Sequence, residues 1–501
     1  MVVSGLSFFK ISDWSFDPRY PSNFDYSKLQ HGDRVFLNLD YFTHFYDQIK
    51  NSTEKKKFVL ITHNADQPFT DNHYNTIKDF VYRIYAINNT CKNPNVVTIP
   101  IAFQDWPKNH FNLIVGLALK HKSFEKKNLI YMNFSIGTNP TKRTECFNYF
   151  NSFDWVTKKS NITKEEFMQD LVQSKYVISP EGTGIDCHRI YEAIAVGCIP
   201  IVKKSKTVMD DFYAKLPIIL VEDWNEITHD FLTRDYQIYK DTLNHWLDTN
   251  KGWMTPEHWI QKLHFISFGD EKYTRTKIRL KKQAIDSKFF SSINLYGPQD
   301  FGEDFKHKDF CTQNPRGYGY WIWKLYFVLK KLREVNYNDV VVFADAGSSV
   351  NKNGKKRLQE YLTMLNDEHD NDIVCFQMIH TEYKYTKNDI FEYFKTTDEV
   401  KNSGQLVGGV LFIRKTDRII NFLQKLYEIN SNNYNFIDDS PSKTPNHTEF
   451  IDNRHDQSTF SVIMKSEYKN KAIVFEETWP QVNNDWSLIN HVPILATRLR
   501  F

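Results

Sequence analysis

The chain has 501 residues, of which 41% are hydrophobic and 25% are charged. This composition is ordinary for a soluble globular protein, and the length is enough for two or three domains with cores of their own. The formal net charge of +3 argues against a dedicated nucleic-acid-binding protein, which would carry a strong basic excess.

Cysteine usage and the N-terminal residues set further limits. The six cysteines are Cys91, Cys146, Cys187, Cys198, Cys311 and Cys375, and no two form a Cys-x-x-Cys pair, which argues against a zinc site. The N-terminus lacks a charged segment followed by a sustained apolar one, and no stretch reaches the roughly 18 apolar residues of a membrane-spanning helix. We therefore expect a cytoplasmic protein without a membrane anchor.

The first half of the chain alternates between strand and helix patterns. Residues 1–35 are aromatic, polar and weakly periodic, which predicts an irregular arm. Strands are predicted at 34–39, 57–62, 96–101, 129–134, 176–178, 199–202 and 218–221, and helices at 74–87, 164–173 and about 186–196. Strands that alternate with helices indicate an α/β domain with a parallel sheet. A polar helical region over 225–259 closes this domain.

A second α/β pattern begins near residue 260. Strands are predicted at 264–268, 293–295, 340–344, 373–376 and 410–413, with a basic amphipathic helix over 274–287. No Pro-, Ser- or Gly-rich linker marks the boundary, and the two halves share no internal repeat. The sequence thus predicts two Rossmann-like α/β domains, 1–260 and 261–501.

Residues 179–202 carry the most informative motif of the chain. Pro180, Gly182 and Gly184 predict a loop between an apolar strand and a helix. Such a loop offers free backbone N–H groups to an anion at the helix N-terminus. Arg189 and Glu192 are three residues apart on that helix and share a face. This arrangement suits a nucleotide-sugar donor, although an ordinary strand–turn–helix unit with a surface Arg–Glu salt bridge is the alternative.

The same segment resembles the donor-binding segment of exostosin-like GT-B glycosyltransferases, which end in a similar Glu-Ala-x-x-x-Gly-Cys-Ile-Pro-Ile-Val run. The resemblance is specific over about 25 residues and looser over 40–235. It implies that Arg189 faces the donor diphosphate, that Glu192 holds the ribose and that Arg143 helps to bind the pyrophosphate. The residues that it implies for the sugar pocket and its loop are Glu181, Gly182, Asp186 and His188.

Two candidate bases follow the predicted strand 57–62. His63 and Asp66 come at its carboxyl end, where ligands bind in open α/β sheets, and either could deprotonate an acceptor hydroxyl. A simple turn explains them equally well. We expect no metal in this half, because helix dipoles and basic side chains stabilise a leaving diphosphate. About 260 residues is short for two full Rossmann-like layers, so we expect a reduced N-terminal layer.

In the second half, the strand 340–344 ends in Asp345-Ala-Gly347. A carboxylate followed by small residues supplies a hard oxygen ligand for Mn²⁺ or Mg²⁺ beside a diphosphate. The pattern resembles the Asp-x-Asp motif of GT-A glycosyltransferases, with Gly347 in place of the second Asp. The resemblance implies a metal held by Asp345 and His491, with Lys324 on a phosphate. A turn-capping Asp345 and a structural His491 are the alternatives.

Two further segments resemble GT-A enzymes. Gly408 and Gly409 precede a predicted strand, where a similar segment approaches acceptor and donor sugar. Arg454-His455-Asp456 resembles a His-Asp-Gln/Glu segment whose acidic residue contacts the acceptor or the transferred sugar. Asp456 is therefore our candidate general base or sugar-holding carboxylate. An N-cap for the following helix is an alternative that is compatible with this role.

Taken together, the motifs predict a bifunctional glycosyltransferase that uses UDP- or GDP-sugars and a glycan or glycoprotein acceptor. The expected cofactor is Mn²⁺ or Mg²⁺ for the second half only. One active half with a carbohydrate- or nucleotide-binding partner half is the alternative. The Lys- and Asn-rich, anchor-free character is similar to giant-virus glycosyltransferases, for which the location would be the host cytoplasm.

Overall fold

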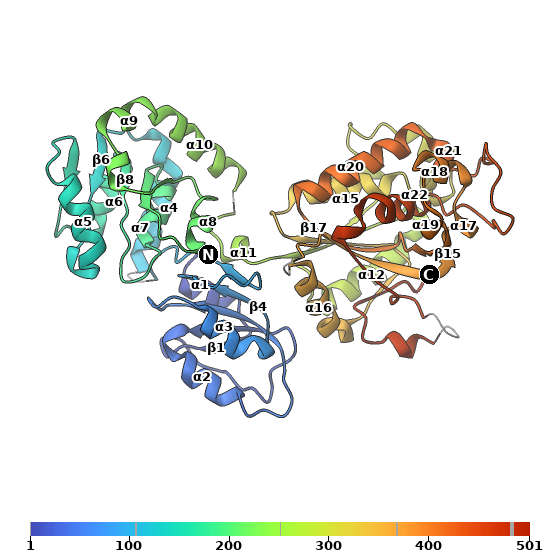
Figure 1. Cartoon of the computed structure of the whole chain (residues 1–501), viewed down its shortest axis with the longest axis horizontal. Coiled ribbons are helices and arrows are strands. Elements are labelled where there is room, and N and C mark those ends of the chain that lie inside the picture. Colours follow the sequence, from blue (N-terminus) through green and yellow to red (C-terminus); the bar gives the residue numbers. More distant parts are fainter. Residues whose placement is uncertain (1, 106–107, 251, 367–368, 481–484, 501) are drawn as a thin grey trace. The chain divides into compact units, whose positions relative to one another are not determined.

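The computed structural model describes residues 2–105, 108–250, 252–366, 369–480 and 485–500. Contacts divide the chain into two compact units, Met1–Ile260 and Gln261–Phe501, here called the first and the second unit (Figure 1). Both are built from sheets with flanking helices, so the predicted α/β class is confirmed. Among the described helices, none is long and apolar enough to cross a membrane.

The first unit contains two five-stranded parallel sheets. The first sheet has the order β1-β2-β3-β4-β5. Its strands are β1 (Trp14–Phe16), β2 (Arg34–Asn38), β3 (Phe58–His63), β4 (Val81–Ala86) and β5 (Val96–Thr98). The helices of this part are α1 (Gly5–Lys10), α2 (Phe42–Ile49) and α3 (Asp71–Ile77).

The second sheet of this unit has the order β10-β9-β8-β6-β7 and is also parallel. Its strands are β6 (Asn128–Met132), β7 (Val156–Lys158), β8 (Ser174–Ile178), β9 (Ile199–Lys203) and β10 (Ile219–Val221). The helices are α4 (Lys108–Lys120), α5 (Pro140–Phe150), α6 (Lys164–Val172), α7 (His188–Ala195), α8 (Val208–Tyr213), α9 (His229–Arg234), α10 (Tyr236–Thr249) and α11 (Pro256–Trp259).

Three predictions for the first sheet were wrong. The single helix expected over 74–87 is a short helix, α3, followed by strand β4. Val81–Ala86 is rich in β-branched and aromatic residues, which favour a strand between two partners. The arm expected over 1–35 contains α1 and the edge strand β1. The first layer is also not reduced, because its sheet has five strands, as the second sheet has.

Alternation of side chains gives each face of the first sheet its own core. Val35 and Leu37 pack with α2 and α3, whereas Phe36 belongs to the large core around the second sheet. That core includes the fully buried Tyr131, Tyr176 and Tyr191. The described cysteines are all free and buried, as small apolar side chains would be.

The second unit has one large mixed sheet with the order β12-β11-β13-β17-β15-β16, and β18 pairs with β15. Its strands are β11 (Leu263–Phe268), β12 (Ser292–Tyr296), β13 (Val340–Ala344), β15 (Ile373–Thr381), β16 (Gly404–Leu406), β17 (Val410–Arg414) and β18 (Ala472–Phe475), and a separate pair is formed by β14 (Ser349–Val350) and β19 (Ile494–Leu495). Strands β11, β12 and β13 are parallel, and β17 runs antiparallel to β13.

Helices cover both faces of this sheet (Figure 1). Val341 and Phe343 face a core with α15 (Trp323–Glu334), α20 (Asp417–Asn432) and α22 (Asp456–Ile463). Val340 and Val342 face the core with α12 (Thr274–Ser287) and α16 (Lys355–Leu365). The remaining helices are α13 (Lys308–Gln313), α14 (Gly317–Tyr320), α17 (Glu382–Tyr385), α18 (Asn388–Tyr393), α19 (Asp398–Asn402) and α21 (Tyr434–Ile437).

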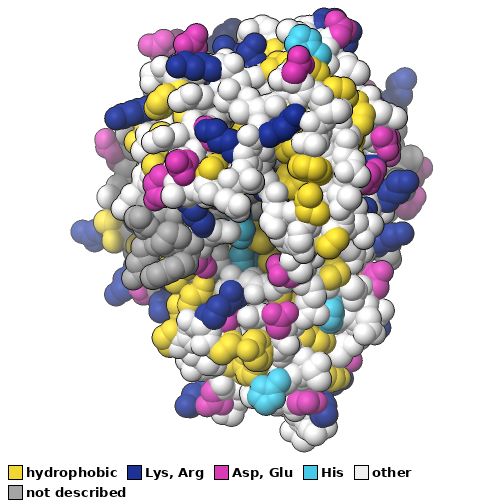
Figure 2. Space-filling view, turned by 90° about the vertical axis from the view of Figure 1, so that its left-hand side faces the viewer, with side chains coloured by type: hydrophobic (Ala, Val, Ile, Leu, Met, Phe, Trp, Pro, Cys, Tyr) yellow, Lys and Arg dark blue, Asp and Glu magenta, His cyan; other side chains and the backbone are white. Residues whose placement is uncertain are grey.

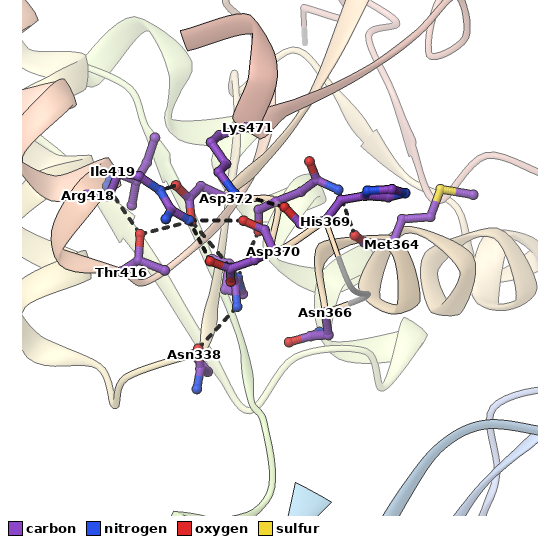
Figure 3. A network of polar contacts seen from close by, with 12 residues as sticks. Asn338, Met364, Asn366, His369, Asp370, Asp372, Thr416, Arg418, Ile419 and Lys471 are labelled. Carbon is purple, nitrogen blue, oxygen red and sulfur yellow. Dashed lines mark hydrogen bonds and ion pairs between the residues drawn. The ribbon is translucent and has the colours of Figure 1, made fainter. Parts of the chain in front are cut away.

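A buried polar network ties β15, β17 and α20 together at one edge of the sheet (Figure 3). The Asp372 carboxylate is fully buried and accepts hydrogen bonds from Thr416 Oγ1 at 3.0 Å, from Arg418 Nε at 2.6 Å and from the Tyr468 hydroxyl. In the antiparallel register, Arg414 at the end of β17 lies opposite the start of β13. The network is therefore at the edge opposite to the end of β13, where Asp345 follows.

Candidate functional site

In the first unit, the loop 179–187 is tied to the first sheet. The Asp186 N–H donates to Asn88 Oδ1 at 2.8 Å, and Asn88 Nδ2 donates to the Ala65 carbonyl at 3.3 Å. A Cβ at Gly184 would lie 2.6 Å from Asn88 Nδ2, so this close approach requires glycine. Asn88 thus joins the loop after β8 to the loop after β3.

Two arginines of the second sheet flank one aromatic ring. The guanidinium carbons of Arg143 and Arg189 lie 5.7 and 5.9 Å from the centre of the Phe134 ring. Arg143 donates to the carbonyls of Glu181 and Ser135, each at 2.8 Å. Arg189 Nε is buried and has no hydrogen-bond partner among the described residues. Burial, with the nearby Arg189 charge, lowers the pKa of Arg143. In the described part of the chain neither arginine pairs with a carboxylate, so the two together can attract an anion.

Asp186 is buried, and its carboxylate oxygens are used within the unit. They accept hydrogen bonds from the N–H groups of Ile101 and Cys187 and from the hydroxyls of Tyr191 and Tyr213, at 2.7–3.0 Å. Burial raises the pKa of Asp186. These contacts anchor the loop, and a role in sugar binding stays a prediction.

The other residues implied for donor binding surround the same loop. Glu181 is half-buried, and burial raises its pKa. A Cβ at Gly182 would lie 3.1 Å from Arg143 Nη2, so the loop packs closely on that guanidinium. His188 Nδ1 lies 2.7 Å from a backbone carbonyl oxygen, and Glu192 is buried one turn further along α7. The structure therefore brings these side chains to one end of α7.

The two candidate bases differ in their surroundings. His63 is buried, its Nδ1 contacts Asn64, and its Nε2 has no hydrogen-bond partner among the described residues. Burial lowers the pKa of His63 to about 4, with His188 also disfavouring the charge and Asp105 favouring it. Such an imidazole is neutral at pH 7 and a weak proton acceptor. Asp66 is exposed. Figure 2, with the first unit towards the viewer, shows histidine side chains in a recess flanked by basic residues.

In the second unit, the carboxyl ends of β11, β13 and β15 and the start of β17 meet at one edge of the sheet. A cavity of about 700 Å³ and a second of about 350 Å³ open there. Both are lined by Asp345, Gly347, Gly409, Arg454, Gln457 and Arg498. The two cavities therefore adjoin at Asp345, which suits two ligands that must react with each other.

A buried ion pair lies in the wall of the larger cavity. Lys324 Nζ is 2.7 Å from Asp456 Oδ2, with side-chain exposures of 5% and 10%. Burial raises the pKa of Asp456 to about 6, with Lys324 opposing and Asp345 adding to the shift. Burial disfavours the charge on Lys324, but the Asp456 and Asp345 carboxylates raise its pKa. The pair can hold a proton acceptor ionised near neutral pH inside the cavity.

Gly408 and Gly409 each lie where close contacts leave little room for a side chain, and the contacts differ between the two positions. A Cβ at Gly409 would lie 2.5 Å from Asp345 Oδ2, so the carboxylate occupies the space of the missing side chain. The Asp345 N–H donates to the Gly409 carbonyl at 2.8 Å. Gly408 donates its N–H to Gln457 Oε1 at 3.0 Å, and a Cβ there would lie 3.1 Å from Gln457 Cβ. The glycine pair thus allows β17 to start directly against Asp345 and α22.

A left-handed turn precedes Lys324. Five consecutive residues, 317–321, have positive φ, and three of them are Tyr318, Tyr320 and Trp321. Non-glycine residues pay roughly 1–2 kcal/mol each for this conformation. The larger cavity is lined by Gly317, Tyr318 and Trp321. Strain of this kind persists where the surrounding structure imposes it, often at functional sites.

Of the two predicted metal ligands, Asp345 and His491, His491 lies away from the cavities. His491 is 59% exposed, contacts Glu477 at 3.6 Å and is not among the residues that line the cavities. Among the described residues, no group of three or more His, Cys, Asp or Glu side chains could hold a metal ion. Asp345 is the one of the two predicted ligands that lies at the cavities, and the metal stays a prediction.

Several residues at these sites were not identified in the sequence analysis. Phe134 and Asn88 in the first unit follow strand ends, as binding residues often do, but nothing in their sequence context predicted their partners. Arg454 is two residues before Asp456, in the same motif, so that motif could have identified it. Arg498 and Arg500 lie 153 and 155 positions after Asp345 by their numbers and reach its cavity only through the fold.

Comparisons with known proteins point to one class. Residues 130–254 match a family model described as the RXYLT1 C-terminal domain. Ribitol-5-phosphate xylosyltransferase 1 of Danio rerio is 29% identical over 86 residues, which are 15% of this chain and 19% of that protein. The match therefore spans about a fifth of the relative's length. The matched segment of the first unit is glycosyltransferase-like, and it contains both Arg143 and Arg189.

Two solved structures are also similar. A glycosyltransferase involved in the glycosylation of the major capsid of PBCV-1 aligns with 47% of this chain and 93% of its own, at 10% identity and a TM-score of 0.28. The galactosyltransferase LgtC, in complex with donor and acceptor sugar analogs, aligns with 46% and 86%, at 12% identity and a TM-score of 0.27.

Proposed function

We propose that the chain is a glycosyltransferase with two centres, a GT-B-like one in the first unit and a GT-A-like one in the second. The observation that carries the proposal is the pair of arginines, Arg143 and Arg189, which flank Phe134 without a carboxylate partner among the described residues. They lie in the segment that matches the RXYLT1 C-terminal domain. A guanidinium pair of this kind suits a diphosphate, which it can bind through bidentate hydrogen bonds.

In the first unit, the donor diphosphate would lie between Arg189 and the N-terminus of α7, where the positive end of the helix dipole favours an anion. Glu192, one turn along the same helix, would accept hydrogen bonds from ribose hydroxyls. The leaving nucleoside diphosphate would be stabilised by these fixed positive groups. Asp66, which is exposed, is the better placed of the two candidate bases, because His63 is buried with a low pKa.

In the second unit, the donor would occupy the larger cavity and the acceptor the smaller one, with Asp345 between them. Asp456, held ionised by Lys324, would accept the proton of the acceptor hydroxyl or hold the transferred sugar. The acceptor oxygen would form a bond to the sugar C1 as the bond between C1 and the diphosphate oxygen breaks, and the electron pair of the broken bond would stay on the diphosphate oxygen. Because Gly409 has no side chain, the Asp345 carboxylate has room to lie at this junction of the two cavities.

The test is a donor panel with the full chain. UDP- and GDP-linked sugars, including a xylose donor because the Danio rerio relative is named a xylosyltransferase, are incubated with the protein and the release of nucleoside diphosphate is measured. We expect release from at least one donor. If the Arg189→Ala change alone abolished all release of nucleoside diphosphate, the chain would have a single active centre, in the first unit. A full panel without release or binding would contradict the proposal.

A further inference from the structure

The C-terminal segment 494–500, here called the C-terminal strap, lies directly against the residues that follow Asp345. Strand β19 pairs with β14. The Leu499 N–H and Thr497 Oγ1 both donate to the Gly347 carbonyl at 2.9 Å. A Cβ at Gly347 would lie 3.1 Å from the Arg498 Cα. The strap therefore packs so closely on Gly347 that a side chain at this position would push against its backbone.

The strap brings two arginines to the candidate site. Arg498 lines both cavities, and Arg500 lines the larger one. The Arg498 guanidinium lies over the Trp479 ring, 4.9 Å from its centre. Within the described ranges, neither arginine has a carboxylate partner. Both are exposed, so their guanidinium groups can reach a ligand in the cavity.

The ionisable groups around the larger cavity leave positive charge uncompensated. Two of its four carboxylates are already paired, Asp456 with Lys324 at 2.7 Å and Asp452 with Arg316 at 3.2 Å. The groups that remain are the carboxylates of Asp270 and Asp345 and the cations Lys272, Arg454, Arg498 and Arg500. Arg454 and Arg498 both line the two cavities, and burial, and to a lesser extent the Arg498 charge, lower the pKa of Arg454.

This donor set does not fit a divalent cation well. Mn²⁺ and Mg²⁺ take oxygen ligands. Among the described residues, Asp345 is the one carboxylate that lines both cavities, and Asp270 is the other unpaired carboxylate of the larger one. A dication beside Asp345 would face Arg454 and Arg498 at the same wall. An anion with several oxygens fits the same wall, because guanidinium groups bind phosphates through paired hydrogen bonds.

We propose that Arg498 and Arg500 of the C-terminal strap bind the diphosphate of the donor and supply the positive charge that a metal ion would otherwise provide. This inference rests on the proposed GT-A-like function of the second unit. The strap then lies beside position 347, where an Asp-x-Asp motif has its second carboxylate, and its arginines replace the charge of the metal ion that such a carboxylate would hold. Binding of nucleoside diphosphate to the second unit is accordingly independent of divalent metal.

The experiment measures binding by titration calorimetry to the full chain in an Arg189→Ala background, which weakens the first unit's site. The ligands are UDP, GDP and inorganic pyrophosphate in EDTA, with the nucleotides repeated in MnCl₂. We expect nucleotide affinity in the two buffers to agree within about twofold. Arg498→Ala with Arg500→Ala weakens it about 100-fold, or about tenfold for each charged hydrogen-bonding group lost.

Two controls separate charge from folding. Arg498→Lys with Arg500→Lys keeps the charge and recovers part of the affinity. Arg333→Ala removes an exposed arginine of the second unit that bonds to Gln424 and leaves binding unchanged; melting temperatures check that all variants fold.

Three results overturn or separate the claims. Nucleotide binding that appears only with MnCl₂, or that survives the double alanine change, overturns the role of the strap and leaves the GT-A-like function standing. Arginine-dependent binding of pyrophosphate without any nucleotide binding supports the strap as an anion site and contradicts the GT-A-like function. No binding of any ligand overturns both.

Discussion

The two units reach a candidate donor site by different routes. In the first, the loop 179–187 and α7 present Arg189 and Glu192 from one continuous segment, with Arg143 added from the neighbouring α5. In the second, Lys324, Asp345, Gly409, Asp456 and Arg498 come from five separate segments that meet at one sheet edge. A local motif can be recognised in one sequence, whereas a site assembled from distant segments becomes visible only in the fold.

The electrostatics of the two sites differ as well. In the first, Arg143 and Arg189 have no carboxylate partner in the described part of the chain, which suits binding of a diphosphate. The second combines a buried carboxylate–lysine pair with unpaired arginines, which suits both proton transfer and anion binding. The predictions below test whether this division into two centres holds.

The largest effect should come from Asp345→Asn. Removing the charge at the junction of the two cavities should lower transfer by the second unit about 1,000-fold, the scale of losing one pre-organised electrostatic group. Activity of the first unit should remain. Nucleoside diphosphate release with each unit's own donor measures both. Asp398→Asn, an exposed carboxylate paired with Lys401, is the matched control, and equal losses in the two variants would contradict the assignment.

Asp372→Asn should destabilise the second unit by about 3 kcal/mol, because it removes the charge of a fully buried carboxylate that accepts hydrogen bonds from Thr416 and Arg418. Urea unfolding, followed together with the activity of each unit, should show the second unit's transition move to lower urea alone. Asp370→Asn is the control: it contacts Arg414 and Arg418, but it is 55% exposed and should cost less than about 1 kcal/mol. A joint shift of both transitions would show that the units unfold as one.

Arg189→Ala should weaken donor binding to the first unit roughly tenfold to 100-fold, since it removes a charged group that has no structural partner for its Nε. Thermal stability should hardly change. Arg143→Ala should lose affinity and stability together, because Arg143 also bonds to two backbone carbonyls. Arg234→Ala, on an exposed arginine paired with Asp230 and Asp235, serves as the control in the same binding titration. Unchanged affinity in Arg189→Ala would remove the arginine pair from the donor site.

The smallest effect concerns pH. Asp456 must be ionised to accept a proton, and its pKa is raised to about 6, so second-unit activity should fall as the pH drops through 6. Lys324 lowers that pKa, and Lys324→Met should therefore move the acid limb to higher pH, by about one unit for each 1.4 kcal/mol of lost attraction. The pH dependence of kcat/KM measures the limb, and the first unit's profile is the internal control. If the acid limb of the pH profile did not move in Lys324→Met, the role of Asp456 as the proton acceptor would be contradicted.

Much of the fold could be predicted from local pattern. The helix over 274–287 and the strand over 340–344 were predicted with the bounds that the structure has, because continuous apolar runs and amphipathic repeats identify such elements. Strand β4 was missed because Val81–Ala86 follows a helix directly and could continue its pattern. Strands as short as β14 and β19 pair with each other across more than a hundred residues and leave no local signal.

The site was partly predictable for the same reason. Asp345, Asp456 and Lys324 were each identified from their own segments, and the structure brings the three together. His491 was chosen from the GT-A resemblance and its position near the C-terminus, and it contacts Glu477 instead. Asp186 was expected at the sugar, but its carboxylate is used by four donors within the unit, which a sequence motif does not reveal.

The sequence by itself determined the α/β class, most of the longer strands of the sheets and the residue types at their carboxyl ends, because side-chain periodicity and turn residues act over a few positions. Tertiary structure alone decided that Gly347 makes room for the C-terminal strap, that Arg498 and Arg500 reach the cavity of Asp345, and that Lys324 pairs with Asp456. These contacts join residues far apart in the chain, and their energies depend on burial and distance, which exist only once the sheet has formed.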